Sequence, residues 1–256
     1  MFTMVAFGED IDLAAALAAI TAVPDQHVFY VGDDIRIPAL NNVVGLAAGA
    51  PVVGAEVTEA RLTAPSLRAR GYLHVHPISG GADAQPEPGP AGLVMDMRRT
   101  PCPLVVGESI NAEFLSDSTV AQFHWLLVWL ADGPIIPVEG NIQTIRLDSA
   151  TAAVAQAWTT VPLVPQVDLE SGSYEIVGMR GQGATMIAAR LILTESPWRP
   201  GVVGNDVITD EGAPIFRYGK FGSFGSFRHD TPPQAEVLCD AADAAQNIWL
   251  DVIKVG

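Results

Sequence analysis

The sequence feature that most constrains the fold is a repeat that closes each half of the chain. The segment Gln234–Gly256 can be laid on Asn111–Gly133 without a gap, at an offset of 123 positions. Each copy ends in an apolar run followed by Gly. The identities include the pairs Ala112 and Ala235, Glu113 and Glu236, Leu115 and Leu238, Asp117 and Asp240, Ala121 and Ala244, and Gly133 and Gly256. Such self-similarity predicts two similar domains in tandem.

A second, shorter echo occurs earlier in each half. The tripeptide Ala60-Arg61-Leu62 is followed by Pro65 and Arg68, and Ala189-Arg190-Leu191 is followed by Pro197 and Arg199, at offsets of 129 to 132. The two echoes come in the same order, which favours duplication over coincidence. The segment 133–140 holds two prolines and two glycines and suits a short, stiff connector. We therefore expect one domain over residues 1–138 and a second over residues 139–256.

Short apolar runs separated by Gly and Pro predict an all-β fold. Gly and Pro together supply 43 of the 256 residues, from 24 Gly and 19 Pro, and only 17% of the residues are charged. The run Phe123–Ala131 is apolar on both alternating faces, so we expect a strand that is covered on both sides, with a buried helix as the alternative. The alanine-rich segment Asp10–Ile20 is predicted to form a short N-terminal helix, capped by Asp10 or Asp12 and ended by Pro24. The segments Ser79–Gly92 and Ser196–Pro214 lack a periodic pattern and are expected to be long surface loops.

The charge of the chain argues against binding to nucleic acid. Its formal net charge is −15, from 29 acidic and 14 basic residues. A surface this acidic repels phosphate backbones. The two cysteines, Cys102 and Cys239, do not form a disulfide framework and are expected to be free. The first ten residues lack a basic region and the longest apolar run has nine residues, so we expect neither a secretory signal nor a membrane span.

The pair His74 and His76 has the spacing of metal ligands on one face of a strand. The cupin family uses such a pair together with a nearby glutamate and a later histidine. Here the next glutamate, Glu87, comes eleven residues after His76, and no later histidine lies in a matching motif. Two histidines on a partly exposed strand are therefore the main interpretation, and a bicupin-like metal-dependent enzyme or small-molecule binder is kept as an alternative.

Phenylalanine and glycine alternate in the segment Tyr218–Phe227. Phe221, Phe224 and Phe227 recur every three residues. Aromatic rings between glycines can stack on bases, but the acidity of the chain opposes this. We expect an arm whose rings dock into a neighbouring domain or subunit.

No motif in the sequence carries a recognisable catalytic function. The segment Gly107–Asn111 lacks the second glycine of a nucleophile elbow. The acidic stretches Asp33-Asp34 and Asp206–Glu211 do not match an EF-hand loop. We therefore predict no catalytic residue, no cofactor and no metal site.

The duplicated plan and the ending shared by both halves resemble the double jelly-roll major capsid proteins of tailless icosahedral viruses. The resemblance implies two tandem jelly-roll-like β-sandwiches and a subunit that self-assembles into a virion shell through homotrimers with a pseudo-sixfold outline. It also implies possible contacts with other capsid or membrane proteins of the virion, and no enzymatic activity. A carbohydrate-binding β-sandwich is a third reading, which exposed tryptophans would favour.

Overall fold

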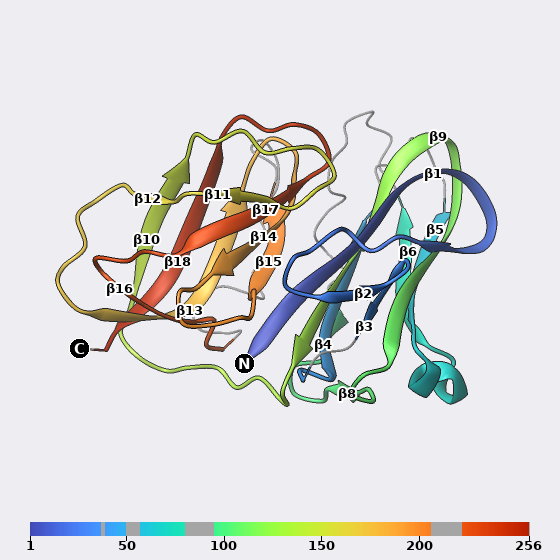
Figure 1. Ribbon diagram of the computed structural model, residues 1–256, viewed down its shortest axis with the longest axis horizontal. Helices are drawn as coiled ribbons and strands as arrows, with labels where there is room; N and C mark the ends of the chain where they lie inside the picture. Colours follow the sequence, from blue (N-terminus) through green and yellow to red (C-terminus); the bar gives the residue numbers. More distant parts are fainter. Residues whose placement is uncertain (37–38, 50–56, 80–94, 206–221, 256) are drawn as a thin grey trace. The chain divides into compact units, whose positions relative to one another are not determined.

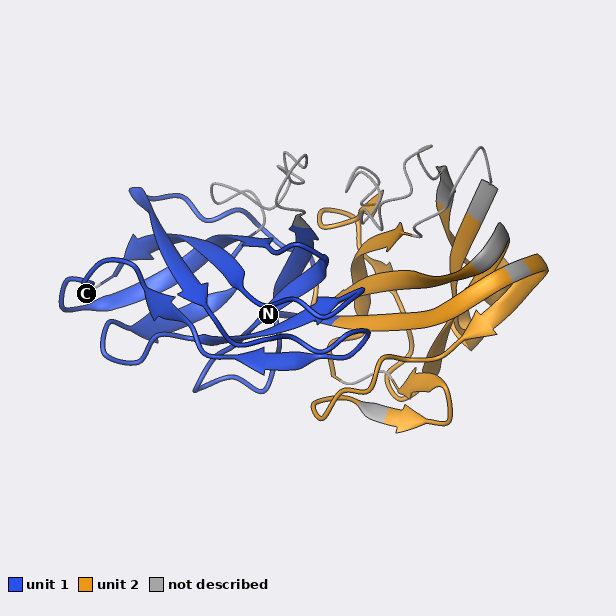
Figure 2. Ribbon diagram, turned by 90° about the horizontal axis from the view of Figure 1, so that it is seen from above, with its two compact units in different colours: residues 1–4, 134–256 blue, residues 5–133 orange. Residues whose placement is uncertain are grey.

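The computed structural model describes residues 1–36, 39–49, 57–79, 95–205 and 222–255. These residues form two compact units, which are coloured separately in Figure 2. The N-unit is Val5–Gly133, and the C-unit is Pro134–Gly256 together with Met1–Met4. Both units are built from β-strands, which confirms the all-β fold class (Figure 1).

Antiparallel pairing dominates the described ladders of the N-unit. Strand β9 is central: it pairs with β1, β3, β4 and β5, while β2, β6, β7 and β8 extend the network. One 3₁₀ helix, η1, ends at Gly71, which adopts the left-handed conformation that favours glycine (φ 78°). The elements are β1 (Phe2–Ile20), β2 (Phe29–Val31), β3 (Asp34–Arg36), β4 (Asn42–Gly49), β5 (Val57–Thr63), η1 (Pro65–Arg70), β6 (Leu73–Ser79), β7 (Met95–Asp96), β8 (Cys102–Pro103) and β9 (Ser109–Ala131).

The C-unit has its own nine-stranded network within the described residues. Its strand order is β11-β17-β14-β15-β13-β18-β10-β12, and β16 pairs with β13. The strands are β10 (Ile142–Ser149), β11 (Thr159–Val161), β12 (Val164–Pro165), β13 (Ser173–Gln182), β14 (Met186–Ile192), β15 (Gly201–Asn205), β16 (Gly225–Arg228), β17 (Gln234–Cys239) and β18 (Gln246–Lys254).

Strand β9 supplies more buried apolar residues to the N-unit core than any other strand of that unit. It bends into two limbs, of which the first pairs with β5 and the second with β4 (Figure 1). Near the bend, the Phe114 ring packs edge-on against the His124 ring with their centres 5.5 Å apart. All residues of Phe123–Ala131 are buried, so the prediction of a strand covered on both faces is confirmed. The predicted alternative of a buried helix is wrong for this run.

The two repeats found in the sequence correspond to equivalent strands. The second limb of β9, Phe123–Ala131, matches β18 residue for residue at the offset of 123, and the first limb matches β17. The partner strands β4 and β13 also match, with the similar sequences Val43-Val44-Gly45-Leu46 and Ile176-Val177-Gly178-Met179. Each carries a β-bulge immediately before the glycine, between Val43 and Gly45 and between Ile176 and Gly178. Bulges are positioned features of a sheet, so a shared bulge supports a duplicated architecture.

The predicted helix over Asp10–Ile20 is wrong, because this segment is part of strand β1. Strand β1, which contains the segment, pairs with β9. The residues on either side of the segment are joined to each other by an antiparallel bridge between Phe7 and Ala22 and by a hydrogen bond of 2.9 Å from Gly8 N to Thr21 O. The helix propensity of alanine contributes only tenths of a kcal/mol per residue, and a helix of eleven residues is marginal in water. Strand pairing therefore outweighs local preference here.

One expected loop contains a strand. The segment Ser196–Pro214 includes β15, which pairs with β14. Gly201 and Val202 of β15 lie opposite Arg190 and Ala189 of β14. Residues 206–214 of that segment and residues 80–92 of Ser79–Gly92 lie outside the described residues. None of the helices in the described ranges has the length and apolar character that a bilayer crossing requires.

Candidate functional site

The two sequence echoes meet in the structure as a pair of oppositely charged side chains in each unit. In the N-unit, Arg61 on β5 lies opposite Glu113 on β9, with Arg61 Nη2 2.5 Å from Glu113 Oε2. In the C-unit, Arg190 on β14 lies opposite Glu236 on β17, with Arg190 Nε donating to Glu236 Oε2 at 2.7 Å. The flanking register is also the same, since Leu62 faces Ala112 and Leu191 faces Ala235. Each unit therefore contains the same cross-strand ion pair at the same position.

The environments of the two ion pairs differ. The Arg61 and Glu113 side chains are each 24% exposed, whereas Arg190 is 1% and Glu236 is 10% exposed. Arg190 also lies over the Trp158 ring at 3.9 Å from the centroid, and Arg199 Nε lies 3.7 Å from Glu236 Oε2. The C-unit pair is thus desolvated and held by a second arginine and an aromatic ring.

The first residues of the chain complete this cluster in the C-unit. Met4 N donates to Arg199 O at 2.9 Å, and Arg190 Nη1 donates to Met4 O at 3.1 Å. Arg199 N donates to Thr3 Oγ1 at 3.1 Å. A Cβ on Gly201 would come within 2.5 Å of Ala189 O, so only glycine allows the close packing at this point. The start of β1 therefore acts as an added strand of the C-unit, which no local sequence signal indicates.

The histidine pair singled out in the sequence does not come together with a ligand set. Both ring nitrogens of His74 have partners within the N-unit: Nδ1 lies 2.5 Å from Glu59 Oε1, and Nε2 lies 3.0 Å from Gly71 O. The side chain of His76 is outside the described residues, although its backbone belongs to β6. Among the residues that the structure describes, no three of His, Cys, Asp and Glu are grouped to hold a metal ion.

The phenylalanine arm packs inside its own unit. Phe224 is buried and contacts the Phe2 ring edge-on at 4.9 Å, and Phe227 is buried and stacks on Tyr174 at 5.4 Å. The expectation that these two rings dock into a neighbouring domain or subunit is therefore wrong, because residues of the same unit bury them. Phe221 lies outside the described residues.

Two buried titratable groups, His124 and Cys239, line neither of the two hollows described below. His124 is fully buried, and its Nδ1 donates to Gln122 O at 2.8 Å while Nε2 accepts from the Ser116 hydroxyl at 2.9 Å. Burial lowers the pKa of His124, so the ring is neutral at pH 7. Burial also raises the pKa of the Cys239 thiol to about 12, with further contributions from the charges of Asp243 and Asp240. At neutral pH the Cys239 thiol is therefore not a thiolate nucleophile, and both ring nitrogens of His124 are held in hydrogen bonds.

A hollow lies at the corresponding end of the equivalent strand pair in each unit. In the N-unit it adjoins the last β5–β9 pair, Thr63 opposite Asn111. In the C-unit it adjoins the residues after the last β14–β17 pair, Ile192 opposite Gln234. The two hollows therefore lie at equivalent positions of the duplicated fold, although different residue types line them.

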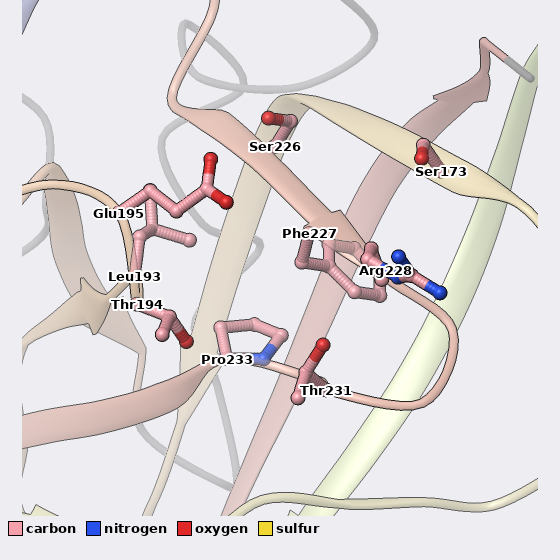
Figure 3. A pocket seen from close by; sticks show the side chains of 9 residues that line it. All are labelled: Ser173, Leu193, Thr194, Glu195, Ser226, Phe227, Arg228, Thr231 and Pro233. Carbon is pink, nitrogen blue, oxygen red and sulfur yellow. The ribbon is translucent and has the colours of Figure 1, made fainter.

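The C-unit hollow has a volume of about 240 Å³ and a mixed lining. In the view of Figure 3, the Glu195 carboxylate extends from one wall, and the Phe227 ring lies between it and the Arg228 guanidinium. Arg228 is paired with Asp230 at 3.3 Å, so its charge is compensated. The lining is completed by Ser173, Leu193, Thr194, Ser226, Thr231 and Pro233.

The N-unit hollow is larger, at about 470 Å³, and its lining includes hydroxyl, carboxylate, amide and guanidinium groups. Its walls come from β3, the end of β5, η1 and the start of β9. Asn111 Nδ2 donates to Asp34 Oδ1 at 2.7 Å, and the Thr63 hydroxyl donates to Asn111 O at 3.3 Å. The lining residues are Asp34, Thr63, Ala64, Pro65, Arg68, Tyr72, Ser109 and Asn111.

Several large apolar side chains are exposed on the described surface. Val105 and Val106 of the N-unit are adjacent and each is 60% exposed. In the C-unit, Val154, Val164 and Val167 are exposed to a similar degree. Single exposed apolar residues are normal on soluble proteins, but adjacent ones provide contact surface for association.

Comparisons with known proteins give one structural resemblance. No family model matches the chain, and no curated protein matches it. Among solved structures, the chain is similar to the major capsid protein P2 from Bacteriophage PM2, with 10% sequence identity and a TM-score of 0.27. The alignment covers 100% of this chain and 98% of that protein.

Proposed function

We propose that this chain is a structural subunit of a virion shell, a major capsid protein that self-assembles as homotrimers. The observation that supports the proposal most directly is the duplicated strand register, in which Arg61 faces Glu113 and Arg190 faces Glu236. Two units with one plan in one chain give a subunit two similar building blocks. This construction supports a role in assembly.

Duplication is useful for a shell because it doubles the number of similar domains that each oligomer presents. Homo-oligomers adopt closed symmetry, and a threefold trimer of a two-unit chain presents six similar blocks around its axis. Six blocks give a near-hexagonal outline, and hexagonal outlines tile a surface. The C-unit and the N-unit would occupy alternate positions in that outline.

The composition of the surface fits a partner that is another copy of the chain. The net charge of −15 disfavours direct contact with a nucleic acid backbone. Val105 and Val106, and the exposed valines of the C-unit, offer apolar area that a subunit contact would cover. We propose that these residues lie in contacts within the shell and that other capsid or membrane proteins of the virion form secondary partners.

The experiment that tests the proposal is negative-stain microscopy of the purified protein across a range of concentrations and salt. The expected result is a population of triangular or hexagonal particles, closed shells, or flat hexagonal arrays. A field of single particles of monomer size at every condition would contradict the proposal. Metal analysis of the purified protein distinguishes the shell subunit from the metal-dependent alternative. The alternative would be favoured if the protein contained stoichiometric Zn, Fe or Mn and lost it in a His74→Ala, His76→Ala variant.

A further inference from the structure

We propose that the N-unit hollow is a saccharide site that prefers a sugar carrying a carboxylate over a neutral sugar. The proposal goes beyond a role in shell assembly and does not depend on it. It rests on the convergence of an aromatic ring, planar polar side chains and a guanidinium on one cavity of about 470 Å³. Small-molecule sites typically have volumes of about 300 to 1,000 Å³, so the hollow can hold one or two sugar rings, whereas the C-unit hollow of about 240 Å³ falls below this range.

The aromatic wall is supplied by Tyr72, whose backbone is held in an unusual conformation. Tyr72 has φ 67° and follows Gly71 with φ 78°, so two successive residues are left-handed. A bulky residue in this region costs about 1 kcal/mol or more and persists only where the surroundings fix it. The Arg61 guanidinium lies 5.0 Å from the centre of the Tyr72 ring and supports it. The C–H face of a sugar ring packs on such an aromatic surface, while the phenol supplies a hydrogen-bonding group.

The polar wall is supplied by Asp34 and Asn111, which are already oriented by each other. The Asn111 amide donates to Asp34 Oδ1 at 2.7 Å, which leaves the second carboxylate oxygen of Asp34 as an acceptor. The Ser109 hydroxyl lies on the same wall. Sugar hydroxyl groups both donate and accept, so the Asp34 carboxylate, oriented by Asn111, and the Ser109 hydroxyl can pair with neighbouring hydroxyl groups on one ring. The preformed Asp34–Asn111 hydrogen bond also lowers the entropic cost of binding.

The preference for an acidic sugar comes from Arg68. Its side chain lies on the exposed surface of η1, and no carboxylate among the described residues forms an ion pair with its guanidinium. A guanidinium binds a carboxylate through two parallel hydrogen bonds. The arginine that lines the C-unit hollow, Arg228, is already paired with Asp230. The N-unit hollow therefore offers a cation to an acidic ligand and the C-unit hollow does not.

Saturation-transfer NMR and titration calorimetry with D-glucuronate and D-glucose test the proposal on the unassembled chain. We expect glucuronate to bind with an affinity near the millimolar range and glucose to bind more weakly. The variant Arg68→Gln should lose about tenfold in affinity for glucuronate with little change for glucose, because it removes one charge-assisted contact. The variant Tyr72→Phe keeps the ring and should weaken both sugars by a few-fold. Circular dichroism confirms that each variant is folded.

The matched control is Arg70→Gln, which removes a second exposed arginine of η1 that does not line the hollow. It should leave binding of both sugars unchanged. The proposal is overturned if neither sugar binds at about 20 mM, or if Arg68→Gln and Arg70→Gln reduce glucuronate binding equally. A chain that binds glucuronate but stays monomeric would contradict the assembly proposal alone, and trimers that do not bind sugar would contradict the saccharide site alone.

Discussion

Arg190 lies opposite Glu236 on paired strands of the C-unit, 2.7 Å apart and almost fully buried, and Arg61 lies opposite Glu113 at the same position of the N-unit. The repeated pair links the two echoes of the sequence, because each echo contributes one partner. The two units share the strand register of this pair, but they differ in how deeply the pair is buried.

The difference in burial predicts that the two ion pairs contribute unequally to stability. The variant Glu236→Gln leaves Arg190 buried without its counter-charge and should lower the free energy of unfolding of the C-unit by about 3 kcal/mol or more. The matched variant Glu113→Gln acts on a pair that is partly exposed and should cost about 1 kcal/mol or less. Equilibrium urea unfolding of both variants measures this difference, and equal losses would contradict the assignment of the C-unit pair as the buried one.

The packing of the first four residues predicts a large effect at Phe2. Phe2 is 3% exposed and contacts Phe224, so Phe2→Ala should destabilise the C-unit by about 3 kcal/mol. Val167 of the C-unit is 64% exposed, so Val167→Ala is the control and should leave the unfolding midpoint unchanged. Thermal or urea unfolding checks both variants. An effect of Phe2→Ala below about 0.5 kcal/mol would mean that the strand is not seated in the C-unit.

The two cysteines are predicted to differ in reactivity. Burial raises the pKa of Cys239 to about 12, and the residue is fully buried, whereas Cys102 is partly exposed. The thiolate is the reactive form, so at pH 8 a thiol reagent should modify Cys102 in the native protein and reach Cys239 only after unfolding. Mass spectrometry of the labelled protein counts the modified thiols. Rapid native labelling of Cys239 would show that the strand pair β14–β17 opens readily.

The hydrogen bonds of Glu108 predict a pH dependence of stability. Burial acts to raise the pKa of Glu108, but hydrogen bonds from the Ser66 hydroxyl and from the N–H groups of Val105 and Ser66 outweigh it and lower the pKa below its ordinary value of 4.5. A carboxylate with a lowered folded-state pKa stabilises the protein at pH values above 4.5, and this contribution is lost as the pH falls through the folded-state pKa. The stability difference between the native chain and Glu108→Gln should therefore be present at pH 7 and shrink below pH 4.5. Urea unfolding at both pH values tests it, and a constant difference would contradict the role of the ionised carboxylate.

The duplicated architecture was predictable from the sequence because it leaves a pattern along the chain. The offset of 123 between Phe123–Ala131 and β18 is visible without any structure, and the apolar faces of that run predict a strand covered on both sides. The ion pairs were not predictable in the same way. Arg61 and Glu113 occur in different echoes, and only the register of β5 on β9 shows that they face each other.

The start of the chain shows where local preference misleads. The alanines of Asp10–Ile20 favour a helix, yet pairing with β9 makes the segment a strand. Strand pairing depends on partner residues about one hundred positions away in the sequence. The helix propensity of a segment is a local property and carries no information about such partners.

The N-unit hollow could not be predicted from the sequence for a similar reason. Asp34, Tyr72 and Asn111 come from three separate segments and carry no common spacing. The left-handed backbone of Tyr72 has one visible signal, the preceding Gly71, but glycine at the end of a short helix is too common to indicate a site.

The mass of the purified protein in solution tests the central claim most directly. If the chain is a shell subunit, sedimentation at increasing concentration should show a species of about 81 kDa, which is three copies of the 27.0-kDa chain, or larger assemblies of such species. A single species of 27.0 kDa that persists at the highest soluble concentration would contradict it.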